Sequence, residues 1–171
     1  MAVLKPRESF EDEKQGRSRL ERMTAAEVHG EQPEFVRQKE NTMKSLVAED
    51  DATNRKLLKT FLSRYGECDI AVDGNEAVNA VLHAIQSGRE YDLVCMDLRM
   101  PKVDGQEAIR EIRREEAANH VTKTARIIVT TVHTDTESIA AALLGRCDAY
   151  LVKPIDTAKL KKELIALGLI Q

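Results

Sequence analysis

Several short apolar runs of this sequence end directly on polar groups that are able to do chemistry. Asp97 follows the apolar run 93–96, within the stretch YDLVCMDLRMPKVDG. An earlier run ends on the acidic triplet 49–51, and two later runs end on Thr130–Thr131 and on Lys153–Pro154. A carboxylate at the end of a buried strand is costly unless something nearby binds it. Asp97 therefore needs a partner from elsewhere in the chain.

Together these groups have the composition of a phosphoryl-transfer site. Carboxylates held close together repel one another, and a hard divalent cation such as Mg²⁺, which prefers oxygen ligands, removes that conflict. Lys153 adds a second positive charge, and the threonines add a hydroxyl donor. A nucleophilic carboxylate, a metal, a cation and a hydroxyl are the parts that attack a phosphoryl group and stabilise its charge. The sequence thus predicts that Asp97 accepts a phosphoryl group beside bound Mg²⁺.

From Met43 onward, strand-like apolar runs alternate with amphipathic helical patterns. We expect strands at 45–48, 68–72, 93–96, 126–130 and 149–152, followed in turn by helices at 53–64, 74–87, 105–117, 136–144 and 157–167. Five βα units in strict alternation imply an α/β fold whose parallel sheet is covered by helices on both faces. The carboxyl ends of parallel strands share one edge of the sheet, where ligands of such folds bind. The polar groups are therefore expected to converge.

Composition excludes several other classes of function. With 26 basic and 29 acidic residues, the chain has no basic field of the size that nucleic acid requires. No apolar run approaches the roughly 18 residues of a membrane span, and the N-terminus lacks the apolar core of a signal peptide. The three cysteines form no CxxC pair and resemble reduced core thiols. We expect a soluble cytoplasmic protein that binds neither nucleic acid nor membrane directly.

Residues 1–42 differ from the rest of the chain in composition and in the spacing of their apolar residues. They are rich in Glu, Arg, Gln and Lys, and their apolar residues are too scattered to build a core. We predict a polar N-terminal extension, disordered or helical, before a domain at 43–171. The extension is either a docking element or upstream sequence that the native protein lacks.

Residues 43–170 resemble the receiver domain of bacterial two-component response regulators. Four pieces carry the resemblance, in the family's order and at nearly its spacing: LVAEDD, DLVCMDLRMPKVDG, RIIVTT and AYLVKP. The resemblance implies a (βα)5 flavodoxin-like fold, also called CheY-like, with five parallel strands in the order 2-1-3-4-5.

The resemblance also assigns the acceptor and the metal ligands. Asp97 matches the phosphorylated aspartate, and Lys153 matches the lysine that pairs with a phosphoryl oxygen. Glu49 and Asp50 match the acidic pair that holds Mg²⁺, with Asp50 as the direct ligand and Glu49 acting through water. Asp97 itself and the backbone carbonyl of Arg99 complete the expected metal site.

Two further matches concern the switch between states. Thr131 matches the hydroxyl that moves onto the phosphoryl group, and Tyr150 matches the aromatic side chain that then swings inward. The Lys153–Pro154 bond is expected to be cis.

Val132 departs from the family, where a small residue is usual. Together with the long side chain of Arg99, it is expected to tune access of water or a phosphatase and to lengthen the life of the phosphorylated form.

The implied function is that of a single-domain response regulator in a phosphorelay. The phosphoryl group would come from a histidine kinase or a histidine phosphotransfer protein, and the output would be an altered face for a downstream protein target or for a homodimer. Such a protein catalyses its own phosphorylation and is not a turnover enzyme. It is either an endpoint or a relay intermediate, and the helix at 53–64 resembles those of relay receivers.

Two other readings of the same residues remain. A phosphorylation-independent binding module on a receiver scaffold would keep the fold without the chemistry. A phosphatase of the haloacid-dehalogenase type also uses an aspartate after a strand, but it needs an acid two residues later. Arg99 occupies that position here, which disfavours hydrolysis.

Overall fold

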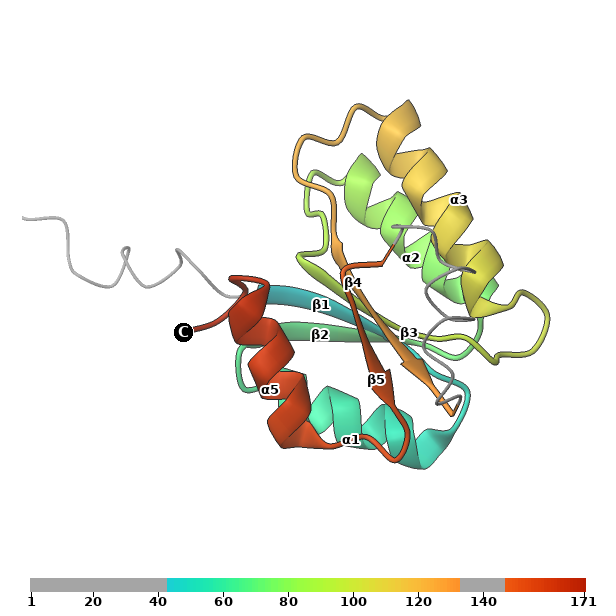
Figure 1. Cartoon of the computed structure of the whole chain (residues 1–171). Coiled ribbons are helices and arrows are strands. Elements are labelled where there is room, and N and C mark those ends of the chain that lie inside the picture. Colours follow the sequence, from blue (N-terminus) through green and yellow to red (C-terminus); the bar gives the residue numbers. More distant parts are fainter. Residues whose placement is uncertain (1–42, 133–146) are drawn as a thin grey trace, which may run out of the picture. The chain divides into compact units, whose positions relative to one another are not determined.

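Five parallel strands form one sheet in the order β2-β1-β3-β4-β5 (Figure 1). The computed structural model describes residues 43–132 and 147–171 of the chain. The strands are β1 (Met43–Ala48), β2 (Gly66–Ala71), β3 (Leu93–Asp97), β4 (Arg126–Thr131) and β5 (Ala149–Val152). They confirm the predicted fold class and strand order. Asp97 and Thr131, which we placed just beyond their strands, are the last residues of β3 and β4.

Helices cover both faces of the sheet. They are α1 (Ala52–Leu62), α2 (Gly74–Gln86), α3 (Gly105–Ala118) and α5 (Thr157–Ala166). Helices α1 and α5 pack on one face, and α2 and α3 pack on the other (Figure 1). The predicted helix 136–144 and the predicted extension 1–42 lie outside the described residues. No helix within the described ranges is long and apolar enough to cross a membrane.

Each of these four helices begins at an aspartate. The side chain of the aspartate accepts a hydrogen bond from a backbone N–H of the first turn, which would otherwise lack a partner. The four residues are Asp51, Asp73, Asp104 and Asp156. Asp51 therefore caps α1, whereas Glu49 and Asp50 precede the helix.

The apolar core has two layers, one on each side of the sheet. Successive residues of a strand point to opposite faces, so Leu46 of β1 packs toward α2 and α3 while Val47 packs toward α1 and α5. The central strands β1 and β3 are buried on both faces. The apolar runs at 46–48 and 93–96 within these strands fit burial on both faces, which removes the alternation of a half-exposed strand.

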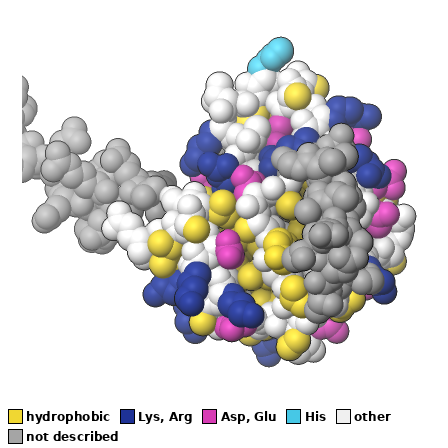
Figure 2. Space-filling view, viewed as in Figure 1, with side chains coloured by type: hydrophobic (Ala, Val, Ile, Leu, Met, Phe, Trp, Pro, Cys, Tyr) yellow, Lys and Arg dark blue, Asp and Glu magenta, His cyan; other side chains and the backbone are white. Residues whose placement is uncertain are grey.

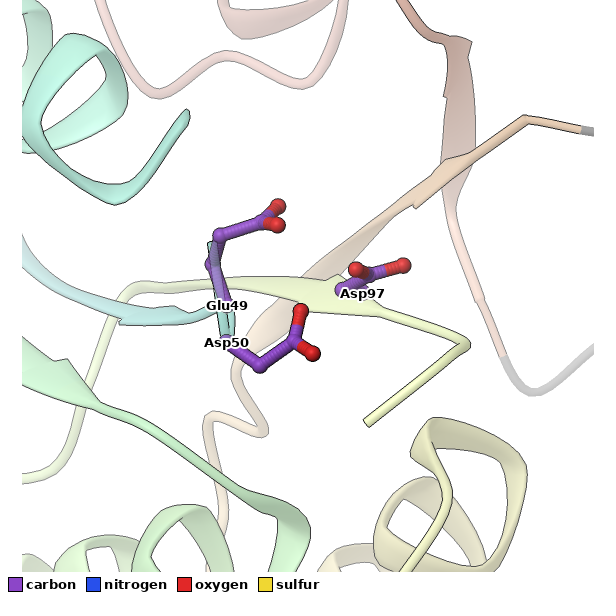
Figure 3. Close-up of side chains that lie close together, drawn as sticks. All are labelled: Glu49, Asp50 and Asp97. Carbon is purple, nitrogen blue, oxygen red and sulfur yellow. The ribbon is translucent and has the colours of Figure 1, made fainter. Parts of the chain in front are cut away.

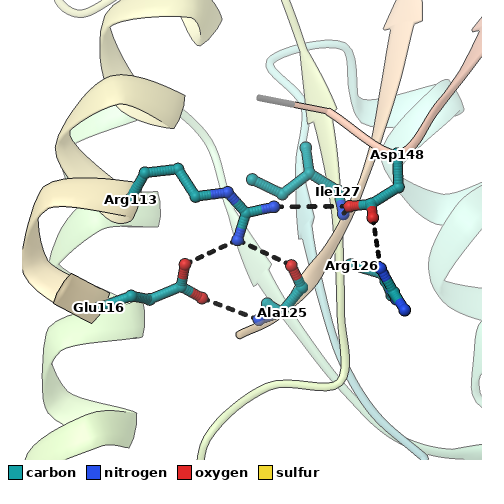
Figure 4. A network of polar contacts seen from close by, with 6 residues as sticks. All are labelled: Arg113, Glu116, Ala125, Arg126, Ile127 and Asp148. Carbon is teal, nitrogen blue, oxygen red and sulfur yellow. Dashed lines mark hydrogen bonds and ion pairs between the residues drawn. The ribbon is translucent and has the colours of Figure 1, made fainter. Parts of the chain in front are cut away.

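A network of polar contacts joins α3 to the amino ends of β4 and β5 (Figure 4). Arg113 donates to Glu116 Oε2 at 2.6 Å and to the carbonyl of Ala125 at 2.9 Å, and it reaches Asp148 Oδ2 at 3.4 Å. Glu116 is buried and accepts from the backbone N–H of Ala125 at 2.8 Å. Asp148 also accepts from Arg126 at 2.7 Å. The network lies at the edge of the sheet opposite the carboxyl ends of the strands.

We expect Arg113→Ala to lower the free energy of unfolding by about 2–3 kcal/mol, because it leaves the buried carboxylate of Glu116 without its cation. Arg114→Ala is the matched control: its side chain is 69% exposed, against 24% for Arg113, and it pairs with Glu111 and Glu115 at the surface. That control should change stability by less than about 0.5 kcal/mol. Urea denaturation at pH 7 measures both, and equal effects would contradict the assignment.

Candidate functional site

Three acidic side chains meet at the carboxyl end of the sheet (Figure 3). Glu49 and Asp50 follow β1, and Asp97 ends β3, the neighbouring strand. One carboxylate oxygen from each of them lies within 4.8 Å of the others. The structure thus brings together the acidic residues that the sequence predicted to converge.

Lys153, which follows β5, reaches across the edge of the sheet to two of these carboxylates. Its Nζ donates to Asp97 Oδ2 at 2.6 Å and to Glu49 Oε1 at 2.8 Å. The backbone N–H of Arg99 donates to Asp97 Oδ1 at 3.1 Å. The Lys153–Pro154 bond is cis, as expected, and the N–H of Lys153 donates to the carbonyl of Thr131 at 2.7 Å. Asp97 is therefore held on both of its oxygens.

The cluster holds more negative than positive charge, and most of that charge is buried. Glu49 and Asp97 are 0% and 4% exposed, whereas Asp50 is exposed. Removal from water raises the pKa of Glu49, and the nearby charge of Asp97 raises it further, against the opposing effect of Lys153. Burial alone would lower the pKa of Lys153, but its hydrogen bonds to Asp97 and Glu49 hold that pKa above the usual value. One ammonium thus contacts two buried carboxylates, while a third, that of Asp50, belongs to the same cluster.

The remaining oxygens fit a hard cation. Glu49 Oε2 is buried and has no hydrogen-bond partner within the part of the chain that the structure describes. Asp50 faces an open cleft, which is also lined by residues 98–101 of the loop between β3 and α3. A set of oxygen donors that is partly open to water is what Mg²⁺ prefers, because it keeps several of its own waters. The residues therefore fit Mg²⁺, with no nitrogen or sulfur donor in the cluster.

The raised pKa of Glu49 predicts a pH dependence of the metal-free protein. When an acid has a higher pKa in the folded state than in the unfolded state, it costs stability at high pH, and this cost disappears as pH falls through the folded pKa toward the ordinary value of 4.5. We expect Glu49→Gln to stabilise the protein at pH 7 and to lose this advantage in acid. Urea denaturation in EDTA across this range measures the difference, and a pH-independent difference would contradict it.

Of the two residues predicted to act as switches, one lies at the end of a strand next to β3 and the other lies on the outermost strand of the sheet. Thr131 is buried at the end of β4, next to Thr130, which pairs with Asp97 in the register of the sheet. Tyr150 lies on the edge strand β5, two strands from β3, and is 44% exposed. Its expected inward swing stays a prediction. Arg99 and Val132, the residues predicted to tune access, have exposed side chains.

Two residues that position the site were missed in the sequence. Arg55 of α1 donates to the carbonyls of Glu49 and Asp50 at 2.7 and 3.0 Å, which anchors the acidic pair. Gly105, which we read only as the start of a helix, passes so close to β3 that an added Cβ would lie 2.1 Å from the carbonyl oxygen of Asp97. The sequence carries no local signal for either contact, because both depend on how segments pack.

Comparison with known proteins agrees with this geometry. Residues 46–165 match the family described as the response regulator receiver domain. The osmosensing histidine protein kinase SLN1 of Saccharomyces cerevisiae is 34% identical over 124 residues, which make up 71% of this chain and 10% of SLN1. The chain spans between 7% and 12% of the length of three histidine kinases that it matches.

Two solved structures share the fold. The receiver domain of the sensor histidine kinase PA1611 from Pseudomonas aeruginosa PAO1, solved with a magnesium ion coordinated in its active site cleft, has a TM-score of 0.60 and 28% identity, and the match covers 74% of this chain and 98% of that one. The receiver domain of Ssk1 from Saccharomyces cerevisiae, bound to the histidine phosphotransfer protein Ypd1, has a TM-score of 0.65 and 29% identity. That match covers 75% of this chain and 90% of the other. The fold, the strand order and the family match over residues 46–165 agree, and this chain belongs to the response regulator receiver domain family.

Proposed function

We propose that the protein is a response regulator that accepts a phosphoryl group on Asp97 from a phosphohistidine. This proposal is carried by the two hydrogen bonds that Asp97 accepts. One comes from Lys153 Nζ at 2.6 Å and the other from the backbone N–H of Arg99 at 3.1 Å. Two more carboxylates lie within reach of a shared cation. A structural acid would need the lysine but not the additional acids.

In the proposed step, a carboxylate oxygen of Asp97 attacks phosphorus while the bond from phosphorus to the histidine nitrogen breaks, and the electron pair of that bond stays on the nitrogen. The ammonium of Lys153, already beside Asp97, moves onto a phosphoryl oxygen. The hydroxyl of Thr131 donates to another. Glu49, Asp50, Asp97 and the carbonyl of Arg99 would hold Mg²⁺, which offsets charge on the phosphoryl oxygens when bound. Because Asp97 is consumed until its phosphate is hydrolysed or passed on, the protein is not a turnover enzyme.

The face formed by α1 and α5 supports a protein donor. Five exposed lysines lie on these helices and make no ion pair with any described residue: Lys56, Lys59, Lys159, Lys161 and Lys162. Figure 2 shows basic side chains gathered at the lower left, over these helices, with apolar side chains between them. Such a surface suits an acidic partner, and a solved relative is bound to a histidine phosphotransfer protein. We propose a relay intermediate, for which return of the phosphoryl group to such a partner is the test.

Incubation with acetyl phosphate tests the chemistry without knowledge of the donor. We expect intact-mass spectrometry to show the gain of one phosphoryl group with Mg²⁺ and none with EDTA. The alternative, a binding module that needs no phosphorylation, predicts no adduct on a folded protein that also fails to bind Mg²⁺.

The exposed residues Arg99 and Val132 predict a slow loss of the phosphoryl group, because Arg99 lines the cleft beside Asp50 and Val132 directly follows Thr131. We expect Val132→Ala and Arg99→Ala each to raise the rate of autodephosphorylation by about threefold or more. The decay of the phosphorylated mass in buffer that contains Mg²⁺, after the acetyl phosphate has been removed, gives the rate. Unchanged rates in both variants would remove the access-tuning role.

A further inference from the structure

The loop between β3 and α3 contains a strained turn at Lys102. The N–H of Val103 donates to the carbonyl of Pro101 at 2.9 Å, which closes a three-residue turn around Lys102. Lys102 has a φ of 67°. Residues other than glycine, Asn and Asp are uncommon in this left-handed region, and three-residue turns with a positive φ at the central residue are rare. Something outside the turn must offset its cost.

That partner is the aspartate that begins α2. Lys102 Nζ lies 2.6 Å from Asp73 Oδ2, while Asp73 Oδ1 accepts from the N–H of Glu76 at 2.9 Å to cap the helix. The side chain of Asp73 is 2% exposed, and Lys102 is its ion-pair partner among the described residues. The hydrogen bond from Lys102 holds the pKa of Asp73 below its ordinary value. The exposed lysine stem thus ends on a buried carboxylate.

Two glycines leave the loop little room on either side. An added Cβ at Gly74, the first residue of α2, would lie 2.5 Å from the carbonyl oxygen of Val103. At the other end of the loop, Gly105 passes against Asp97, and its N–H donates to the carbonyl of Leu98 at 3.0 Å. The backbone around Arg99 is therefore held between the end of β3 and the first turn of α2.

We propose that Lys102 is a positioning residue for the metal site: by binding Asp73, it fixes the loop that presents the backbone of Arg99 beside Asp97. This inference rests on the proposed function, since it concerns the Mg²⁺ site proposed above. It makes α2 part of the site although no side chain of α2 belongs to the acidic cluster.

The sign of a charge effect separates positioning from simple electrostatics. Lys102 is a cation near a cation site. If it acted only through its charge, removing the ammonium would tighten Mg²⁺ binding. If Lys102 positions the loop by binding Asp73, removing the ammonium frees the loop and weakens Mg²⁺ binding. Lys102→Met keeps the stem and removes the ammonium, and Lys102→Gly also relieves the positive φ. A drop in affinity in both variants is therefore independent of turn strain.

Calorimetric titration with Mg²⁺ tests the inference on the full chain. We expect the dissociation constant to rise about fivefold in Lys102→Met and in Lys102→Gly, and Asp73→Asn to add no further loss to either, as for two residues of one contact. Lys123→Met is the matched control, because Lys123 pairs with Asp92 at the same 2.6 Å, outside the cluster. Its affinity should equal that of the wild type.

A second readout needs no metal. In the metal-free protein, amide hydrogen exchange of Val103 and Gly105, followed by NMR, should be faster in Lys102→Met and unchanged in Lys123→Met. Wild-type binding of Mg²⁺ with equal or tighter binding by both Lys102 variants would overturn the inference alone. Absence of Mg²⁺ binding by the wild type would overturn the proposed function, and the inference with it.

Discussion

Lys153→Met is expected to lower the free energy of unfolding of the metal-free protein at pH 7 by about 3–4 kcal/mol. The substitution leaves Glu49 and Asp97, both buried, with no ammonium between them. Removing one partner of a buried ion pair costs this much because a charge stays behind without compensation. Here two carboxylates stay behind and also repel each other. Urea denaturation in EDTA gives the number.

A surface lysine provides the comparison. Lys123 also makes a 2.6 Å ion pair, but its side chain is 80% exposed, against 12% for Lys153. We expect Lys123→Met to change stability by less than about 1 kcal/mol. We also expect Mg²⁺ to restore more stability to Lys153→Met than to the wild type, because the metal replaces the missing positive charge. Similar losses in the two variants would show that the buried ion pairs of Lys153 stabilise the fold no more than a surface ion pair does.

Gly105→Ala is expected to have the second large effect, on both stability and phosphorylation. Its Cβ would lie 2.1 Å from the carbonyl oxygen of Asp97 and 2.8 Å from Cα of Leu98, which are backbone atoms that cannot rotate away. The end of β3 must therefore shift. We expect a loss of about 2–3 kcal/mol in the free energy of unfolding. The phosphorylation rate should fall by about tenfold or more, because the acceptor moves relative to Lys153.

Gly88→Ala separates this steric effect from the general cost of replacing glycine. Gly88 has a φ of 63° but no atom within 4 Å of an added Cβ, so the change costs only backbone strain, about 1 kcal/mol. Phosphorylation of that variant by acetyl phosphate should proceed at the wild-type rate. An equal loss of rate in both variants would show that the contact between Gly105 and Asp97 does not position the acceptor.

The sheet and the convergence of the site were predictable because they follow from short-range rules. Alternation of strands and helices implies a parallel sheet, and parallel strands bring Glu49, Asp97 and Lys153 to one edge however far apart they lie in sequence. The strand at 149–152 was predicted with its observed bounds. Each of the other described helices and strands differed from its prediction by one or two residues at one or both of its ends, where caps and edge pairing decide.

What could not be predicted depends on contacts between segments. Nothing local distinguishes Glu49, which is fully buried under Lys153, from its exposed neighbour Asp50. The left-handed turn at Lys102 is stabilised by Asp73, 29 residues earlier in the chain. Neither propensity nor spacing indicates that pairing. The position of Tyr150 on the edge strand follows from topology, whereas its role as a switch concerns a second state and stays a prediction.

The central claim is that Asp97 carries the phosphoryl group. After incubation with acetyl phosphate and Mg²⁺, borohydride reduction converts a phosphorylated aspartate to homoserine, and peptide mass spectrometry locates it. We predict homoserine at position 97 in the wild type, none in EDTA, and none in Asp97→Asn. A label at another residue, or an unlabelled Asp97 in folded protein that binds Mg²⁺, would contradict the account.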